Sequence, residues 1–348
     1  MTDISTGRPM ADIGGSREGP TISVVIPVRN EAETIERCLE AVLNQTSQLE
    51  EVIVVDDGST DETGSIVKRI ADLDGRRVTL VNNRSRGPSS ATNSGILRAR
   101  GDIVWLVDGD AIVDRNWIKL ALPFFEDPEV GGVAGTILPA NPDTFWAAFA
   151  GCDIGHRFAG RLKSQDVGHI STCATAYRRN ALLCVGLFDE QIRYGYDKDM
   201  SYRLKKAGYR LVVCKDLKVE HFWKEGLFPY IRQQCMAASG YLSVILKHKE
   251  RRFGDEESGP REFVNIILFY IGCLSILVAR GLPFFSIVST VCILTQAGEG
   301  VILAWKAEYR VSRRFKILFP IGVLVRNMSW SIGLFSGLLR HVYRRIGT

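Results

Sequence analysis

Asp108 and Asp110 are the residues whose spacing points most directly to chemistry. They are separated only by Gly109 and follow residues 103–107 (IVWLV), an apolar run of the right length for one buried strand. Two carboxylates cannot continue such a strand without partners, because an unpaired buried charge is very costly. Carboxylates at the carboxyl end of a strand lie where α/β sheets bind ligands, and oxygen ligands suit Mg²⁺ or Mn²⁺. The alternative is a polar turn.

A second acidic turn, Asp56-Asp57-Gly58, follows the apolar run EVIVV at residues 51–55. A carboxylate accepts two N–H bonds, so it is able to bind the imide edge of uracil or the amide edge of guanine. Alternatively, Asp57 only caps the next helix. Arg86 lies in a glycine-bearing loop where it is able to contact phosphate, or it is a solvated surface residue.

Two further sites carry groups that ionise or bind metals. Asp197 and Asp199 open a predicted helix, where caps and the helix dipole favour acids, and where a functional carboxylate would be held rigidly. His221 ends a predicted strand and is followed closely by Trp223. A single histidine at a strand end is either structural or a metal ligand.

Residues 21–107 contain the strands and helices that are predicted to position the acidic turns. Four apolar runs alternate with helical patterns, at residues 21–28, 51–55, 78–81 and 103–107. Such alternation predicts an α/β fold with a mostly parallel, doubly wound sheet that is covered by helices on both faces. Residues 171–178, 211–214 and 217–221 are predicted to be further strands, and residues 227–247 a long helix.

Charge is distributed unevenly along the 348 residues. The net charge is +5, but residues 1–246 contain 29 Lys and Arg against 32 Asp and Glu, whereas residues 247–348 contain 15 against 7. The basic excess therefore coincides with the most apolar region, which favours a membrane with anionic lipid and not a nucleic acid as the partner. The eight cysteines are scattered, as expected for buried thiols in a reducing compartment.

The apolar tail predicts membrane helices. Residues 263–279 and 284–305 are long and apolar enough to be spans, whereas residues 315–339 contain Arg326 and Asn327, which are costly inside lipid. We therefore expect two spans followed by one or two interfacial helices; buried helices of a soluble protein are the alternative. The expected organisation is a disordered arm (1–20), a catalytic domain (21–225), an amphipathic linker region (226–260) and transmembrane and interfacial helices (261–348).

Four segments together resemble the family 2 glycosyltransferases, whose nucleotide-diphospho-sugar transferase fold is called GT-A. They are SVVIPVRNEAETIERCLEAVLNQ, VIVVDDGSTDET, GDIVWLVDGD and GLFDEQIRYGYDKDMSYRLKKAGYRL, in that order, and the resemblance covers residues 21–224. Three departures stand out. Tyr196 replaces the usual Glu, Thr92 replaces an arginine, and no Gln-x-x-Arg-Trp follows His221. The last departure indicates a non-processive enzyme.

The resemblance implies a role for each matched residue. Asp197 would be the general base, and Asp110, Asp108 and His221 would hold Mn²⁺ or Mg²⁺. The nucleotide would be bound by Pro27, Arg29, Glu31, Asp56, Asp57, Gly58, Arg86 and Asp108. We expect Tyr194, Asp199 and Trp223 to contact the sugar or the acceptor.

The expected activity is a metal-dependent, inverting sugar transfer from a nucleoside diphosphate sugar. We expect UDP rather than GDP in the donor, and a lipid-linked or envelope glycan acceptor at the cytoplasmic face of the cell membrane, in a multi-pass protein. Two alternatives belong to other classes. A degenerate membrane protein would bind nucleotide sugar without turnover, and a nucleotidyltransferase would carry a Gly-rich basic loop after the first strand, which this sequence lacks.

Overall fold

We analysed a computed structural model of the chain. It describes residues 19–74, 77–83, 87–158, 166–251, 260–279, 281–307 and 311–346. Most of the expected N-terminal arm lies outside these ranges, and so does Arg86, one of the predicted nucleotide contacts.

Four parallel strands form the first half of an eight-stranded sheet, in the order β3-β2-β1-β4. These strands are β1 (Ile22–Val28), β2 (Glu51–Asp56), β3 (Val78–Asn82) and β4 (Ile103–Val107). The helices between them are α1 (Ile35–Leu43), α2 (Thr63–Asp74) and α3 (Pro88–Arg98). Helices α1 and α2 pack on one face, where Ile35 and Val67 enter the core, and α3 packs on the other with Ile96. The predicted doubly wound arrangement is confirmed.

The second half of the sheet is mixed in direction. Its order is β7-β6-β8-β5, in which β6 and β8 are parallel and the pairs β4–β7, β6–β7 and β5–β8 are antiparallel. The strands are β5 (Ala111–Val113), β6 (Val130–Pro139), β7 (Ala174–Arg178) and β8 (Arg210–His221). The short helical elements nearby are α4 (Trp117–Ala121), η1 (Leu122–Glu126), α6 (Arg179–Cys184) and α7 (Tyr196–Lys206).

The two strands predicted at 211–214 and 217–221 are one strand, β8. A shift in its pairing with β6 between Ala134 and Thr136 explains the interrupted apolar pattern, because an irregularity in the ladder changes which side chains face inward. Gly135 lies at this shift. A Cβ atom there would lie 2.0 Å from the carbonyl oxygen of Leu217, so only glycine fits.

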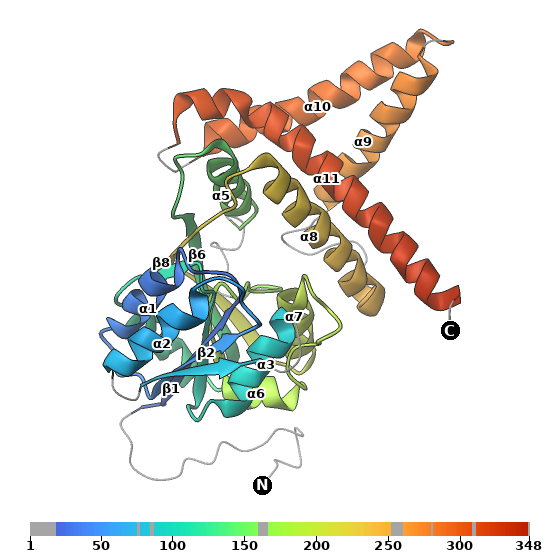
Figure 1. Cartoon of the computed structure of the whole chain (residues 1–348). Helices are drawn as coiled ribbons and strands as arrows, with labels where there is room; N and C mark the ends of the chain where they lie inside the picture. The colour runs from blue at the N-terminus through green and yellow to red at the C-terminus, as the bar shows by residue number, and fades with distance from the viewer. Residues whose placement is uncertain are drawn as a thin grey trace.

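The remaining helices form a separate layer beside the carboxyl edge of the sheet (Figure 1). They are α5 (Phe145–Phe158), α8 (Leu227–Lys247), η3 (Lys249–Arg251), α9 (Pro260–Val278), α10 (Phe284–Lys306) and α11 (Arg313–Ile346). Helix α11 packs along α8 at close range, since a Cβ on Gly333 would lie 2.3 Å from the carbonyl oxygen of Cys235. Phe149, Tyr230 and Phe319 join α5, α8 and α11 in one apolar cluster.

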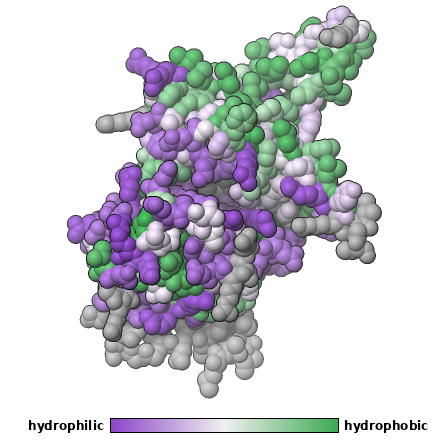
Figure 2. Space-filling view, in the orientation of Figure 1, coloured by the Kyte–Doolittle hydropathy of each residue, from purple (hydrophilic) through white to green (hydrophobic). Residues whose placement is uncertain are grey.

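Two helices are long and apolar enough to cross a membrane: α10 and residues 313–343 of α11. The apolar part of α9, Val264–Val278, is shorter. By length, residues 313–343 are therefore a candidate span although an interfacial helix was expected at 315–339, and α9 is shorter than the span expected at 263–279. Hydrophobic residues gather over α9, α10 and α11, whereas the surface of the sheet region is mainly hydrophilic (Figure 2).

Candidate active site at the carboxyl edge of the sheet

A cavity of about 860 Å³ opens where the parallel strands end, between the sheet and helices α5, α7, α8 and α11. Ten of the residues singled out in the sequence line it together: Pro27, Arg29, Glu31, Asp57, Asp108, Asp110, Tyr194, Asp197, His221 and Trp223. Within the described part of the chain, Asp56, Gly58 and Asp199 are not among its lining residues. One space therefore joins side chains that are far apart in the sequence.

Asp57 fixes one wall of this cavity. Its carboxylate is 5% exposed and accepts hydrogen bonds from the backbone N–H of Gly87 at 3.0 Å and from Asn83 Nδ2 at 2.8 Å. Arg29 Nη1 lies 3.9 Å from it. Asp57 therefore holds the loop after β3. It does not cap the next helix, whose first residue, Thr63, is bonded by Asp61.

Asp56 and Gly58 form the tight turn behind that wall. Asp56 Oδ1 accepts bonds from the N–H and Oγ of Ser59, at 2.8 and 2.6 Å. Gly58 has φ +77°, a backbone conformation that residues with a Cβ atom rarely adopt. In the described structure these two residues shape the loop and do not line the cavity.

The loop after β1 is locked to this turn by side chains. Asn30 has φ +55°, and its Oδ1 accepts the N–H of Thr60 at 2.8 Å. The next N–H, that of Glu31, donates to Thr63 Oγ1 at 2.8 Å. The backbone N–H groups of Asn30 and Glu31 are therefore both bonded to side chains of residues 59–63, which holds the backbone of this loop beside the cavity.

Asp108, Asp110 and His221 meet at the centre of the cavity. Antiparallel pairing of β5 with β8 sets Ala111 opposite His221, which brings His221 Nε2 to 3.2 Å from Asp110 Oδ1. His221 Nδ1 is buried and makes no hydrogen bond within the described residues. The site thus holds carboxylate oxygens and an imidazole nitrogen, a donor set that suits a divalent cation.

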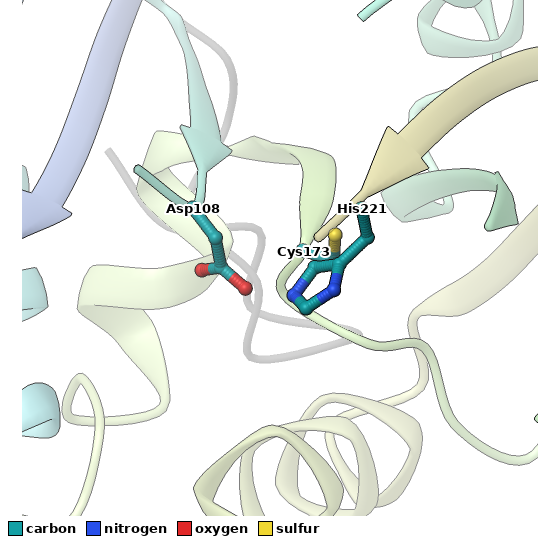
Figure 3. Close-up of side chains that lie close together, drawn as sticks. All are labelled: Asp108, Cys173 and His221. Carbon is teal, nitrogen blue, oxygen red and sulfur yellow. The ribbon is translucent and has the colours of Figure 1, made fainter. Parts of the chain in front are cut away.

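Cys173 lies beside these groups. Its Sγ, a carboxylate oxygen of Asp108 and a ring nitrogen of His221 all lie within 4.8 Å of one another (Figure 3). Burial raises the pKa of Cys173 well above that of a free thiol. Cys173 falls within the strand predicted at residues 171–178. Nothing in its local spacing marks it as a residue of the site, so the sequence did not reveal this role.

Three carboxylates, those of Glu31, Asp108 and Asp110, lie in one part of the cavity, whose lining also contains Lys and Arg side chains. Burial, reinforced by Asp110, raises the pKa of Glu31 to about 7 and that of Asp108 to about 7. Burial also acts to raise the pKa of Asp110, but the charge and hydrogen bond of His221 outweigh it, so this pKa is lowered. Groups shifted by burial and by like charges in a cavity are characteristic of ligand sites.

Asp197 faces the same cavity from the first turn of α7. Gly195, with φ +77°, precedes the helix, and the carboxylate of Asp197 accepts the N–H of Lys198 at 2.9 Å. The charge of Asp197 contributes to the raised pKa of Asp108. An aspartate held at a helix start and open to a cavity is able to take a proton from a bound hydroxyl.

Asp199 is positioned differently from our expectation. It is fully buried, and its carboxylate binds Arg203 Nε at 2.9 Å, Lys247 Nζ at 2.7 Å and His248 Nε2 at 2.8 Å. The predicted acceptor contact is therefore not supported by the geometry, because three partners, two of them at the end of α8, enclose the carboxylate. The sequence concealed this arrangement, since Lys247 and His248 are distant in the chain.

Other cavity residues were also not apparent from the sequence. Lys224, next to Trp223, lines the cavity and acts to lower the pKa values of Glu31 and Asp110. The helix layer contributes a second group, which consists of Ile154, Arg157, Gln233, Gln234, Met236, Ala237, Tyr241 and Trp330. Only the packing of α5, α8 and α11 against the sheet brings this second group into the site.

The fold and site define an α/β protein with an acidic, cation-compatible cavity at its strand ends. Residues 23–186 match the family model described as Glycosyl transferase family 2. The chain is 30% identical, over 72% of its length, to the pre-mycofactocin glycosyltransferase of Mycobacterium tuberculosis. It is 29% identical, over 72% of its length, to the poly-beta-1,6-N-acetyl-D-glucosamine synthase of Staphylococcus aureus. Residues 23–186 of the chain therefore belong to glycosyl transferase family 2.

The chain spans about half of the first of these relatives, 53%, and 64% of the second. Among solved structures, the mannosyltransferase of Pyrobaculum calidifontis in complex with GDP-Man and Mn²⁺ resembles it with a TM-score of 0.59 at 22% identity. That likeness covers 91% of this chain and 87% of the other, and it establishes a shared GT-A fold.

Proposed function

We propose that this protein transfers a sugar from a nucleoside diphosphate sugar to an acceptor hydroxyl, with inversion and with a divalent cation. One observation carries the proposal: Asp108, Asp110 and Asp197 line one cavity, at the edge of the sheet where α/β folds bind ligands. Membership of glycosyl transferase family 2 supports the reaction class.

The side chains at the centre of the cavity are suitable ligands for the cation. Asp108, Asp110 and His221 would hold Mn²⁺ or Mg²⁺, and the unpartnered His221 Nδ1 is a buried acceptor that a cation would satisfy. The surplus of carboxylates, seen in the raised pKa values of Glu31 and Asp108, also fits an added positive charge. When bound, the ion would supply charge neutralisation at the diphosphate leaving group.

The chain's own residues would divide the remaining tasks. Asp57 and Arg29 line the wall beside Pro27, where the base and ribose of the donor would lie. Asp197 would accept the proton of the acceptor hydroxyl as the hydroxyl attacks the anomeric carbon from the opposite side. Tyr194 and Trp223 would contact the sugar. Uracil and guanine both offer N–H groups to Asp57, and we retain UDP as the expected carrier.

The acceptor would enter from the helix layer. There the cavity is bounded by Gln233, Tyr241 and Trp330, so its outer part is both polar and aromatic. Apolar side chains exposed on α9, α10 and α11, such as Leu277, Val291 and Ile317, support attachment to a membrane. We therefore propose a lipid-linked or envelope glycan acceptor at the cytoplasmic face, with residues 21–225 as the catalytic domain.

The test uses the full-length protein in detergent with a panel of labelled nucleotide sugars, Mn²⁺ and lipid extracts. Asp197→Asn should keep donor binding, measured by calorimetry, and lose transfer, whereas Asp110→Ala should lose the Mn²⁺ dependence. Asp216→Asn, on the exposed part of β8, is the matched control and should behave as the wild type. Full activity of Asp197→Asn would refute the base assignment.

A binding protein without turnover is the second candidate, because Tyr196 stands where relatives of this type carry Glu. Tyr196 lines the cavity and packs against Phe188, with ring centroids 5.8 Å apart, but its phenol does not carry the negative charge of a carboxylate. Donor binding with neither transfer nor hydrolysis for any nucleotide sugar in the panel would favour this candidate.

A further inference from the structure

We propose that Cys173 is an additional ligand at the cation site that lets thiophilic ions of the Zn²⁺ class compete there with Mn²⁺ or Mg²⁺. This inference rests on the cation site proposed above. Asp108 and His221 supply the oxygen and nitrogen of the site, and Cys173 adds sulfur (Figure 3).

The geometry brings the three donors together. Their ligand atoms lie within 4.8 Å of one another, and Zn²⁺ bonds of about 2.0–2.3 Å to sulfur, nitrogen and oxygen need only small movements from there. Cys173 is 4% exposed and lines the cavity. Its carbonyl oxygen accepts the backbone N–H of Asp108 at 2.9 Å, so the ladder between the two segments fixes the thiol beside the carboxylate.

The chemistry of the donors sets the selectivity. Thiolate is a soft ligand that favours Zn²⁺ and Co²⁺, whereas Mg²⁺ and Mn²⁺ prefer oxygen. On binding, the sulfur–metal bond forms and the thiol proton leaves to solvent. Zn²⁺ held by Cys173, Asp108 and His221 has one position left in a tetrahedral site, too few to bridge a diphosphate as an octahedral ion does. Zn²⁺ should therefore inhibit transfer.

Cys38 provides a matched comparison. It is also fully buried and close to Asp108, but its Sγ lies 3.4 Å from the carbonyl oxygen of Asp108 and is not in the cluster of three donors. Cys38→Ser keeps a hydroxyl that can donate the same bond. Any effect specific to Cys173→Ser therefore reports metal ligation and not the mere loss of a buried thiol.

The experiment is a Co²⁺ titration of the full chain in detergent, in a background with the exposed Cys184 and Cys273 changed to Ser. We expect a near-ultraviolet thiolate-to-cobalt absorption band at one equivalent. The band should persist in Cys38→Ser, disappear in Cys173→Ser and disappear from the wild type on addition of one equivalent of Zn²⁺. Circular dichroism verifies that each variant is folded.

Mn²⁺ binding, measured by electron paramagnetic resonance with nucleotide present, separates the two proposals. Cys173→Ser should change the Mn²⁺ affinity by less than threefold and raise the Zn²⁺ concentration needed for half-inhibition by tenfold or more. A band retained in Cys173→Ser, or absent from a wild type that binds Mn²⁺, overturns the role of Cys173. A wild type that shows the band but binds no Mn²⁺ overturns the proposed cation site for transfer and leaves the thiol site standing.

Discussion

Two buried clusters of charged residues differ in how their charge is balanced. The first, which we call the cavity cluster, consists of Glu31, Asp108, Asp110 and His221. The second, the helix cluster, consists of Asp153 and Arg157 on α5, Glu299 on α10, and Arg326 and Asn327 on α11, so it has two carboxylates and two guanidinium groups. Of this second cluster, only Arg157 lines the 860 Å³ cavity.

The helix cluster is neutralised from within. Arg326 is 2% exposed; its Nη1 binds Asp153, and its Nη2 binds Glu299 Oε1 at 2.9 Å. Asn327 Nδ2 donates to Gln296 Oε1 at 3.0 Å. Burial acts to raise the pKa of Asp153, but the positive charges of Arg157 and Arg326 outweigh this, and the pKa is lowered. Such a cluster has no need of a ligand.

The cavity cluster contains three carboxylates and only one imidazole, and the pKa values of two of these carboxylates are raised. Buried charged residues therefore indicate a ligand site only where positive and negative side chains do not neutralise one another. A balanced cluster fixes the packing of helices, whereas an unbalanced one marks the place where a cation and an anionic substrate complete the electrostatics.

Breaking the balanced cluster should have the largest effect. Arg326→Met would leave Glu299 buried without its ion-pair partner and Asp153 with Arg157 alone, which we expect to cost about 3–5 kcal/mol of stability and to lower the Tm by about 10 °C. Thermal unfolding in detergent measures it. Arg340→Met, exposed on the same helix, is the control. Equal Tm values for the two variants would contradict the structural role.

Repair of that cluster sharpens the comparison. Changing Glu299 to Leu in the Arg326→Met background should recover most of the lost Tm, because the unpaired charge is removed while the Asp153–Arg157 pair is kept. A double variant less stable than Arg326→Met would show that Glu299 is needed for another reason.

The unbalanced cluster should respond in the opposite way. Asp110→Asn should lower transfer by about 10²–10³-fold, because a group that acts on developing charge is lost. The Tm of the metal-free protein should change little, because the repulsion of Glu31 and Asp108 is relieved while the ion pair with His221 is lost. A transfer assay tests the loss of activity, and thermal unfolding without Mn²⁺ tests the effect on stability. A large fall in Tm would show that the cavity cluster stabilises the fold as the helix cluster does.

The dependence of stability on pH gives a third measurement. The pKa of Glu31 is raised from 4.5 to about 7, so between these values the folded protein binds more protons than the unfolded chain. The contribution of Glu31 to the stability of the metal-free protein should therefore be largest below pH 4.5 and should be lost as the pH rises through 7. Glu31→Gln should flatten this part of the curve, which a Tm series from pH 5 to 8 would reveal. An unchanged slope would contradict the raised pKa.

The smallest effect is expected at the surface. Arg69 Nη2 and Glu36 Oε1 are 2.8 Å apart on α2 and α1, but both side chains are about half exposed. Arg69→Ala should cost no more than about 0.5 kcal/mol, since water screens the pair. A Tm change comparable with that of Arg326→Met would undermine the distinction between buried and exposed pairs.

The first half of the fold followed from the sequence because each strand and helix there is a local apolar pattern. In the mixed half, β7 and β8 were predicted as strands, but their directions and partners were not, because these depend on pairings between distant segments. In the site, Asp108 and Asp110 were recognisable from spacing alone. Cys173 and Arg157 were not, since only the tertiary fold brings them to the cavity. Arg326 was recognised as costly inside lipid, but its partner Asp153 lies 173 positions away.

The enclosure of Asp199 decides where the polypeptide can be shortened. A fragment that ends at residue 225 would retain Arg203 but discard Lys247 and His248, leaving the Asp199 carboxylate, two residues from Asp197, with one of its three partners. We therefore expect soluble expression of the sheet region by itself to need either a terminus beyond residue 248 or an uncharged replacement of Asp199. The smallest stable fragment would then be longer than the segment that matches the family.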